Sequence, residues 1–461
     1  MSTLLAKNAD VLVTMDAERR ELRGAGLYAV DGFVREVGPT GSLPATADVV
    51  LDLAGQIVLP GLVNTHHHLN QTLTRAFPAA QEAGLFDWLT AQYPAWTRID
   101  AEASRTSTLV GLAELLLSGC TTVFDHTYLF QSGNSVDVQV EAAREIGVRF
   151  HASRGSMSVG RSKGGLPPDE AVEDEAAILR DSERVVDRYH DPRPGAMTRV
   201  VLAPCAPFSV SADLLRESAA LARDRGVRLH THLAETLDEE RYTRERFGCR
   251  PVEWMDRLGW VAGDVWFAHA VHVDDAEIAR FARAGCGVAH CPSSNMRLAS
   301  GIAPVRKYLR AGVPVGLAVD GSASNDGGNM LLEARQAMLL ARLGLALREG
   351  ARAPGEWMTA REALEIATLG GARVLGRDDV GSLEAGKGAD FFTLDLGAVE
   401  YAGALHDPVA ATLFCAPTRA RFTVVHGRVV VEDARLTTVD LPGVVARHNR
   451  LAEAVARGGA V

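Results

Sequence analysis

Short apolar runs alternate with amphipathic stretches along the middle of the chain, from Gln56 through residue 375. Each run has the length of a buried strand, and each intervening stretch carries its apolar residues at helical spacing. The stretch 211–226 is typical, because Ser211 suits a helix N-cap and Gly226 suits the position after a last turn. The runs are QIVLPGLV (56–63), TTVFDH (121–126), VRFHAS (148–153), TRVVLAP (198–204), VRLHTHL (227–233), VWFAHAV (265–271), GVAHCP (287–292) and VPVGLAVD (313–320).

Eight strands that alternate with helices predict a parallel sheet closed into a barrel. Both chain ends have a different pattern. Residues 9–55 alternate in the manner of short strands, with Asp31 and Gly32 suited to a hairpin turn, and short strands return after a helical stretch at 359–376. The sequence therefore predicts an α/β fold, a (β/α)8 TIM-type barrel with a small β-sandwich formed from both ends. The expected division is 1–56 and 376–461 for the sandwich, the latter with a C-terminal helix, and 57–375 for the barrel.

Composition and charge narrow the function classes. The chain has 461 residues, of which 47% are hydrophobic and 23% charged, as in ordinary globular proteins. Its net charge of −10 is spread over scattered acids and no basic cluster is present, so nucleic-acid binding is not expected. The six cysteines form no C-x-x-C pair, and no signal peptide or apolar run of about 18 residues is found. We therefore expect reduced thiols, no membrane attachment and a cytoplasmic location.

Histidines and acids lie at the ends of several predicted barrel strands, where barrel enzymes carry their catalytic groups. The first strand ends in His66, His67 and His68. Because side chains alternate along a strand, His66 and His68 point one way and His67 the other. Zinc takes nitrogen or oxygen ligands at about 2.0 to 2.2 Å with one position open, and His66, His68, a histidine of the fifth strand and Asp320 supply such a set.

The fifth strand leaves a choice between His230 and His232, which share a face. His232 is nearer the strand's C-terminal end and is the predicted ligand, whereas His230 is expected to be packed or to support a ligand. Glu235 follows three residues later and suits proton transfer beside a metal-bound water. His269, at the end of the sixth strand, is suited to orienting that water or the substrate.

Other polar groups at strand ends receive no chemical role. His272 is expected to be structural, and Asp125, His126 and His290 are expected to be hydrogen-bonded groups at the barrel rim. A barrel that only binds a partner would have no need of the complete set of ligands together with Glu235. The sequence therefore favours an enzyme over a binding or scaffold protein.

These residues, in this order, resemble the amidohydrolase superfamily. The motifs are PGLVNTHHH, HLAE, AHAVH and VDGSASND, and the likeness extends over nearly the whole chain. It implies that His66, His68, His232 and Asp320 are metal ligands. It also implies that Glu235 is the proton shuttle, and that His269, together with Asp320, handles the proton of the attacking water.

The fourth strand indicates the branch of the superfamily. Two-metal members commonly carry a carboxylated lysine there, but TRVVLAPCAPFSVS has Cys205 and no lysine. The resemblance thus implies the deaminase branch with one divalent metal per subunit, zinc by preference and iron as the alternative. The zinc motif of cytidine deaminases, H-x-E with P-C-x-x-C, is absent from the sequence.

Within that branch the chain resembles the s-triazine hydrolase and N-ethylammeline chlorohydrolase-like enzymes, through HHHLNQTLTRA, LFDWLTAQYPAW, APCAPFSVS and CPSSNMRLASGIAPV. The implied reaction is hydrolytic deamination of an oxidised purine, 8-oxoguanine, to urate and ammonia. A triazine or pterin (isoxanthopterin) hydrolase with the same metal site is the alternative. A small heterocycle is thus the expected ligand, and a homo-oligomer is the expected assembly. The predicted substrate contacts are Gln71, Trp88, Trp96, Arg154 and Cys205.

Overall fold

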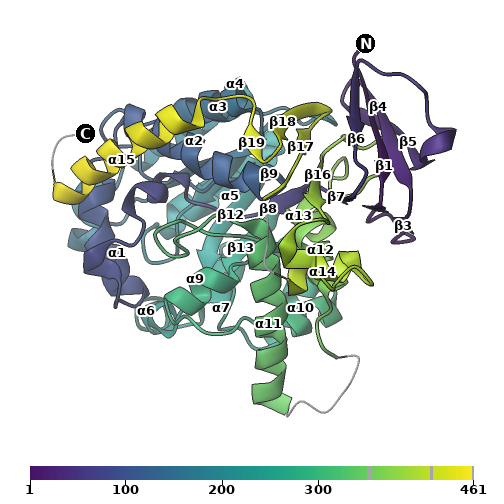
Figure 1. The fold of residues 1–461 in the computed structure, drawn as a ribbon. Coiled ribbons are helices and arrows are strands. Elements are labelled where there is room, and N and C mark those ends of the chain that lie inside the picture. The colour runs from purple at the N-terminus through teal and green to yellow at the C-terminus, as the bar shows by residue number, and fades with distance from the viewer. Residues whose placement is uncertain (350–355, 416–418, 459–461) are drawn as a thin grey trace.

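The computed structural model describes residues 1–349, 356–415 and 419–458, which form a closed barrel with a β-sandwich beside it (Figure 1). The barrel strands are hydrogen-bonded in the order β10, β11, β12, β13, β14, β15, β8 and β9, all in parallel. Their bounds are β8 (Leu62–Asn64), β9 (Cys120–Phe124), β10 (Arg149–Ser156), β11 (Thr198–Pro204), β12 (Arg228–Leu233), β13 (Val265–His269), β14 (Gly287–His290) and β15 (Val315–Leu317). The predicted (β/α)8 barrel is confirmed.

Helices follow every barrel strand and cover the outside of the barrel (Figure 1). Ser211 caps α5 as predicted, because its Oγ accepts from the Leu214 N–H at 3.0 Å, and Gly226 ends that helix with φ 65°. The helices are α1 (Leu85–Trp96), α2 (Ala101–Leu117), α3 (Val136–Ile146), α4 (Glu175–Tyr189), α5 (Ala212–Arg225), α6 (Leu237–Phe247), α7 (Pro251–Arg257), α8 (Asp275–Ala284), α9 (Pro292–Arg297), α10 (Val305–Ala311), α11 (Met330–Glu349), α12 (Ala360–Glu365), α13 (Gly371–Val374), α14 (Pro408–Phe414) and α15 (Leu441–Arg457).

Short helical turns lie in the segments that connect the strands and helices. The 3₁₀ turns are η1 (Thr40–Ser42), η2 (Leu69–Thr74), η3 (Pro78–Ala80), η4 (Arg161–Lys163), η5 (Asp169–Ala171) and η7 (Val399–Tyr401), and η6 (Ile366–Gly370) is a π-helical turn. Of these, η2 begins directly after His68 and is fully buried, so it carries the chain from the first barrel strand along the inside of the molecule.

The sandwich joins the two chain ends. Its four-stranded sheet has the order β5 (Phe33–Pro39), β4 (Ala25–Val30), β1 (Thr3–Ala9) and β6 (Val49–Asp52). The seven-stranded sheet has the order β19 (Arg435–Leu436), β18 (Arg428–Glu432), β17 (Thr423–Val425), β16 (Phe391–Asp395), β7 (Gln56–Pro60), β2 (Val11–Val13) and β3 (Glu21–Leu22). Antiparallel pairing of β16 with β7 brings the ends together, as predicted, and the core between the sheets includes Leu27, Val58 and Phe391.

The single strand expected at 56–63 is instead two strands in different sheets. β7 belongs to the sandwich and ends at Pro60, whereas β8 begins the barrel at Leu62. Gly61 makes the passage possible, since a Cβ there would lie 2.0 Å from Thr121 Oγ1, and its N–H donates to Asp390 O at 2.9 Å. The expected division of the chain near residues 56 and 375 stays a prediction.

The C-terminal helix α15 packs on α2 and η2 rather than on the sandwich (Figure 1). His448 of α15 forms a hydrogen bond of 2.9 Å between its Nε2 and Thr72 Oγ1. The last helix therefore braces the turn that leads away from the histidine triplet. Among the described residues, no helix combines the length and the apolar character that crossing a membrane requires.

A buried ion pair ties the barrel to the sandwich. Arg149, at the start of β10, donates from Nε and Nη2 to the two carboxylate oxygens of Asp390 at 2.9 and 3.1 Å. Its Nη1 donates to Gly195 O and Ala196 O at 2.7 and 2.8 Å. Both charged side chains are buried, so removing one of them leaves the other uncompensated in a medium that solvates it poorly.

We expect Asp390→Ala to lower the free energy of unfolding by about 3 to 5 kcal/mol, measured by denaturant titration. The matched control is Glu145→Ala, which removes the exposed ion pair with Arg105 and should change that free energy by less than about 1 kcal/mol. Equal effects of the two substitutions would contradict the role given to the buried pair.

Candidate active site

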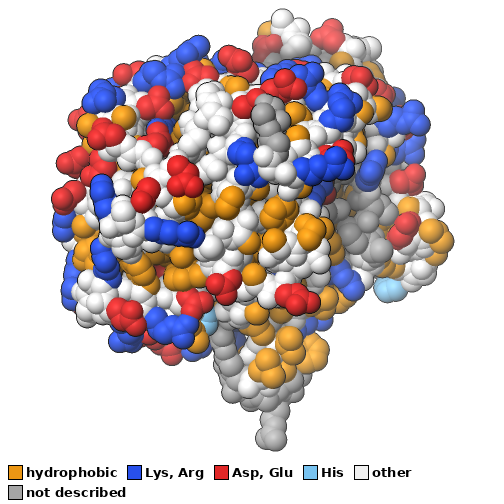
Figure 2. Space-filling view, turned by 90° about the vertical axis from the view of Figure 1, so that its left-hand side faces the viewer, with side chains coloured by type: hydrophobic (Ala, Val, Ile, Leu, Met, Phe, Trp, Pro, Cys, Tyr) orange, Lys and Arg blue, Asp and Glu red, His pale blue; other side chains and the backbone are white. Residues whose placement is uncertain are grey.

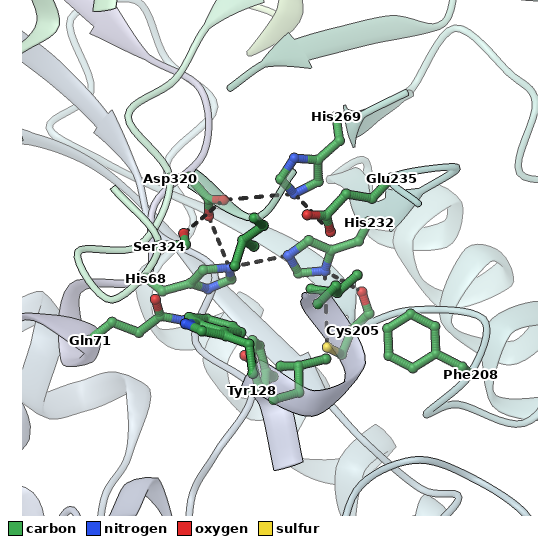
Figure 3. A pocket seen from close by; sticks show the side chains of 14 residues that line it. His68, Gln71, Tyr128, Cys205, Phe208, His232, Glu235, His269, Asp320 and Ser324 are labelled. Atoms are coloured by element: carbon green, nitrogen blue, oxygen red, sulfur yellow. Dashed lines mark hydrogen bonds and ion pairs between the residues drawn. The ribbon is translucent and has the colours of Figure 1, made fainter. Parts of the chain in front are cut away.

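Four barrel strands bring imidazole and carboxylate groups together at their C-terminal ends. His66 and His68 follow β8, His232 lies in β12, His269 ends β13 and Asp320 follows β15. The Nε2 atoms of His68 and His232 are 3.1 Å apart. Asp320 Oδ1 lies 3.2 Å from His66 Nε2 and 3.5 Å from His68 Nε2. The predicted ligands thus lie close together, in one group that contains His66, His68 and His232 and a second that contains His66 and Asp320 (Figure 3 shows those that line the pocket).

The other ring nitrogen of each of these three histidines is held by an acceptor. His68 Nδ1–H donates to His126 O and His232 Nδ1–H to Cys205 O, each at 2.6 Å. His66 Nδ1 lies 2.8 Å from His230 Nε2. Because a proton on each Nδ1 completes these hydrogen bonds, the network assigns a free lone pair to each Nε2.

His230 has the supporting position expected of it. Its Nδ1–H donates to Trp266 O at 2.9 Å, which leaves its Nε2 as the acceptor for His66. His230 is fully buried and does not reach the pocket. A relay from a backbone carbonyl through His230 therefore fixes the tautomer and the ring orientation of His66.

The three facing Nε2 atoms fit a divalent cation. His66 Nε2 is buried and has no hydrogen-bond partner. Burial lowers the pKa of His66 to about 4 and also lowers the pKa of His68 and His232, so all three rings are neutral. Neutral imidazoles whose lone pairs face one another and a carboxylate are the donor set that zinc or iron takes.

Glu235 and His269 stand beside this cluster (Figure 3). Glu235 Oε2 lies 3.4 Å from His269 Nε2, and its Oε1 accepts from Ser300 Oγ at 3.2 Å. Burial raises the pKa of Glu235, so its carboxyl group can hold a proton closer to neutral pH than an exposed glutamate. Burial alone would lower the pKa of His269, but the carboxylates of Glu235 and Asp320 raise it above the usual value.

Supporting residues that the sequence analysis missed hold this pair in place. His269 Nδ1 donates to Asn295 Oδ1 at 2.9 Å. The buried Glu239 accepts from the N–H groups of Ala234 and Glu235 at 2.9 Å each, and burial raises the pKa of Glu239 to about 7. The spacing of Glu239 in the sequence gave no signal, because an acid in the first turn of a helix is common.

Several residues at the same place have strained backbone conformations. Ala234, His269, Ala270 and Asp320 all have positive φ, with values of 52°, 69°, 44° and 62°. Left-handed backbone is unfavourable for residues other than glycine and persists where the surroundings impose it. His269 and Asp320 belong to the site, Ala234 precedes Glu235 and Ala270 follows His269, so these conformations help to direct the side chains at the strand ends inward.

The remaining histidines at strand ends make local contacts. His126 is the fourth imidazole of the cluster; its Nε2 donates to Ala203 O at 2.7 Å, and its buried Nδ1 has no hydrogen-bond partner. Asp125 accepts from the Leu69 N–H at 2.7 Å and so fixes the start of η2. His272 Nε2 donates to Ser300 O at 2.7 Å. Both ring nitrogens of the buried His67 lack a hydrogen-bond partner, and His290 lies outside the cluster.

A pocket opens beside the cluster, and the metal-binding and acid–base groups form part of its lining. Among the predicted substrate contacts, Gln71, Trp88 and Cys205 line it. Other lining residues, which the sequence analysis did not single out, are Leu85, Leu89, Tyr128, Phe208, Leu298 and Ser324. The pocket is therefore mainly apolar and aromatic, with its metal-binding and acid–base groups at one end.

Trp96 and Arg154 are not among the described residues that line the pocket. Trp96 packs against Trp88 at a ring-centroid distance of 5.3 Å and donates from Nε1 to Thr74 Oγ1 at 3.0 Å. Arg154 pairs with Glu173 at 2.8 Å and with Asp181 at 2.6 Å. The side chain of Trp96 is thus packed and that of Arg154 is ion-paired. Their positions in the sequence, near a helix end and a strand end, gave no sign of these partners.

Comparisons with known proteins agree with this arrangement. The amidohydrolase family profile matches residues 57–430. The chain is 48% identical to an 8-oxoguanine deaminase of Pseudomonas aeruginosa, over 94% of this chain and 95% of the relative. It is 41% identical to an isoxanthopterin deaminase from an unknown prokaryotic organism, over 81% of each chain. The crystal structure of the atrazine chlorohydrolase TrzN from Arthrobacter aurescens TC1 complexed with zinc superposes with a TM-score of 0.92 at 35% identity, covering 97% of this chain and 100% of that one.

The geometry predicts that His230 controls the affinity of the site for metal. His230→Leu removes the acceptor for His66 Nδ1–H, so we expect zinc affinity to fall roughly 10- to 100-fold in competition with a chelating indicator. His67→Asn is the matched control, since His67 makes no side-chain hydrogen bond and should leave zinc affinity unchanged. Normal affinity in His230→Leu, or loss of zinc from His67→Asn, would contradict this assignment.

Proposed function

Since the chain belongs to the amidohydrolase family, we propose that it is a metal-dependent hydrolase that deaminates 8-oxoguanine to urate and ammonia. The observation that carries the proposal is the group of three free Nε2 atoms and Asp320 Oδ1, placed with Glu235 at one end of a flat-walled, buried pocket. The similarity to an 8-oxoguanine deaminase over nearly the full length of both chains supports the choice of substrate.

We propose His66, His68, His232 and Asp320 as the ligands of one zinc ion per subunit, with iron as the alternative metal. A zinc ion held by these residues would act as the Lewis acid that makes water a nucleophile at neutral pH. The residue after β11 is Cys205 rather than a lysine, which supports a site for one metal.

Each acid–base group then has a role set by its position. Asp320 Oδ2 and His269 Nε2 lie 3.8 Å apart and would accept or orient the proton of the attacking water. Glu235 would protonate a ring nitrogen beside the attacked carbon and then pass a proton to the departing ammonia. The balance is one water and one 8-oxoguanine consumed for one urate and one ammonia formed.

The pocket walls suit a planar heterocycle. Trp88 is buried, lines the pocket and donates from Nε1 to Ala323 O at 3.2 Å, so its ring is fixed. Phe208 and Leu298 line the pocket as well. Such walls accept a purine or a pterin alike, which keeps isoxanthopterin as the second candidate substrate, supported by the similarity to a deaminase of that compound.

We expect Glu235→Gln to keep its zinc and to lose turnover by at least about 100-fold, because the amide cannot carry the proton. Ammonia release should be measured across guanine, 8-oxoguanine, isoxanthopterin, cytosine and ammeline, with metal content determined on the same samples. Turnover of 8-oxoguanine at a normal rate by the variant would refute the shuttle role. Absence of ammonia release from 8-oxoguanine by the zinc-loaded wild type would refute the proposed function.

We propose also that the protein is a cytoplasmic homo-oligomer. The cysteines support a reducing compartment, since all six are free thiols and five are buried. Self-association is supported by one face of α11, where Leu332, Leu339, Leu343 and Leu347 are 37 to 72% exposed. Their spacing places them along one side of the helix, whose far end projects from the barrel with hydrophobic side chains around it (Figures 1 and 2).

An uncharged helical stripe can pair with its own copy across a two-fold axis. We expect the double substitution Leu339→Glu and Leu343→Glu to reduce the molar mass, measured by light scattering after gel filtration, to that of the monomer. Val399→Glu serves as the control, because Val399 is 81% exposed but lies in η7 outside the stripe. A monomeric wild type, or an oligomer that survives the double substitution, would contradict the interface.

A further inference from the structure

Two polar side chains of the pocket have no part in the proposed chemistry. Of the hydrogen-bonding groups in the described lining, Trp88 Nε1 is taken by Ala323 O at 3.2 Å, and Ser324 Oγ is 3.3 Å from Asp320 Oδ2. The metal-binding and acid–base groups form the end wall. Gln71 and Tyr128 remain as neutral polar groups that can recognise a substrate through hydrogen bonds.

Gln71 is fixed in one orientation. It is 1% exposed, and its Oε1 accepts from the Ala323 N–H at 3.4 Å. Only glycine at position 321 leaves room for it, because a Cβ there would lie 1.9 Å from that Oε1. The same peptide of Ala323 therefore holds both Gln71, through its N–H, and Trp88, through its C=O.

Gln71 and Tyr128 both line the pocket and both are buried. With Oε1 occupied by the Ala323 N–H, the Nε2 group is the donor that Gln71 offers. Among the described residues, no acceptor for the Tyr128 O–H proton is found. Burial raises the pKa of Tyr128 well above its usual value, so the hydroxyl keeps that proton.

Tyr128 stands on the side of the metal cluster away from the acid–base pair. Its ring meets the His68 ring edge to face, with centroids 5.3 Å apart and an angle of 81°. Figure 3 shows Gln71 and Tyr128 below His68, and Glu235 and His269 on the opposite side of the cluster. A ring bound with its reacting carbon at the cluster would place one flank toward Glu235 and the other toward Tyr128.

The chemistry of the proposed substrate matches these two flanks. The attacked carbon of 8-oxoguanine lies between two ring nitrogens, one of which has a carbonyl as its next neighbour. If Glu235 protonates the nitrogen on its own side, the carbonyl falls on the side of Tyr128. We propose, resting on the function proposed above, that Tyr128, whose ring packs against His68, donates its O–H to this carbonyl and selects rings that carry an oxo group there.

This contact discriminates between rings with and without the oxo group, because the buried O–H of Tyr128 stays unpaired when the oxo group is missing. A ring with hydrogen at that position offers no acceptor, and a ring with an amino group opposes donor to donor. An unsatisfied buried donor costs about 1 to 3 kcal/mol, which corresponds to a preference of roughly 10- to 100-fold for the oxo compound. Phe208, elsewhere on the wall, has no polar atom and contributes no such preference.

The test compares two ligands that differ in this carbonyl and in the proton on the ring nitrogen beside it, and the Tyr128→Phe substitution separates the two effects. Zinc-loaded Glu235→Gln protein binds ligand without turnover, so its dissociation constants can be measured for 8-oxoguanine and for 2-amino-8-oxopurine, which lacks the carbonyl. We expect 8-oxoguanine to bind roughly 10- to 100-fold more tightly. Adding Tyr128→Phe should bring the two constants within about threefold of each other, while zinc content stays the same.

Phe208→Leu in the same background is the control. It should weaken the binding of both ligands by the same factor, so that the preference for 8-oxoguanine is kept. The inference is overturned if Tyr128→Phe keeps the preference, if it weakens both ligands equally, or if neither ligand binds the Glu235→Gln protein. Ammonia release by wild type answers the separate question of the reaction. Failure to deaminate 8-oxoguanine would refute the proposed function, whereas the ratio of the two dissociation constants still decides the role of Tyr128.

Discussion

The structure depends on the arrangement of three imidazole lone pairs and one carboxylate that face each other in a buried site. The Nε2 atoms of His68 and His232 are 3.1 Å apart, and His66 Nε2 faces Asp320 Oδ1 at 3.2 Å. Neutral donors placed so closely repel one another unless a cation lies among them. The hydrogen bonds of the opposite ring nitrogens, to two backbone carbonyls and to His230, prevent the rings from turning away.

The barrel explains how such an arrangement is held. Its strands are short and buried, and the residues that follow them take strained backbone conformations at Ala234, His269 and Asp320. Residues beyond the strand ends then fix the acid–base groups and the side chains of the pocket wall. Glu239 holds the backbone beside Glu235, Asn295 holds His269, and the peptide of Ala323 holds both Gln71 and Trp88. The site is therefore preorganised by contacts that are themselves buried.

Much of this could be predicted from the sequence because it follows from local periodicity. The eight apolar runs and their helices indicated the barrel, and alternation along a strand separated His66 and His68 from His67. Depth along one strand favoured His232 over His230 as the ligand. The structure places His230 behind His66 and His232 beside His68, although the roles of these residues as ligands stay predictions.

What the sequence could not supply depends on partners that are distant along the chain. The run 56–63 reads as one strand, but it divides at Gly61, whose N–H donates to Asp390 O and which has no Cβ to clash with Thr121. Arg154 finds Glu173 and Asp181, and Trp96 finds Thr74, so neither lines the pocket. Tyr128 was overlooked since its proposed role rests on its position against His68, which comes from another barrel loop.

The central claim is that three histidines and Asp320 hold a single metal ion without help from Cys205. X-ray absorption at the zinc edge of the purified, zinc-loaded protein tests this directly. The account predicts a first shell of nitrogen and oxygen atoms at about 2.0 to 2.2 Å with the outer-shell scattering of three imidazole rings. A zinc–sulfur distance of about 2.3 Å, or scattering from a second metal at about 3.5 to 4 Å, would contradict it.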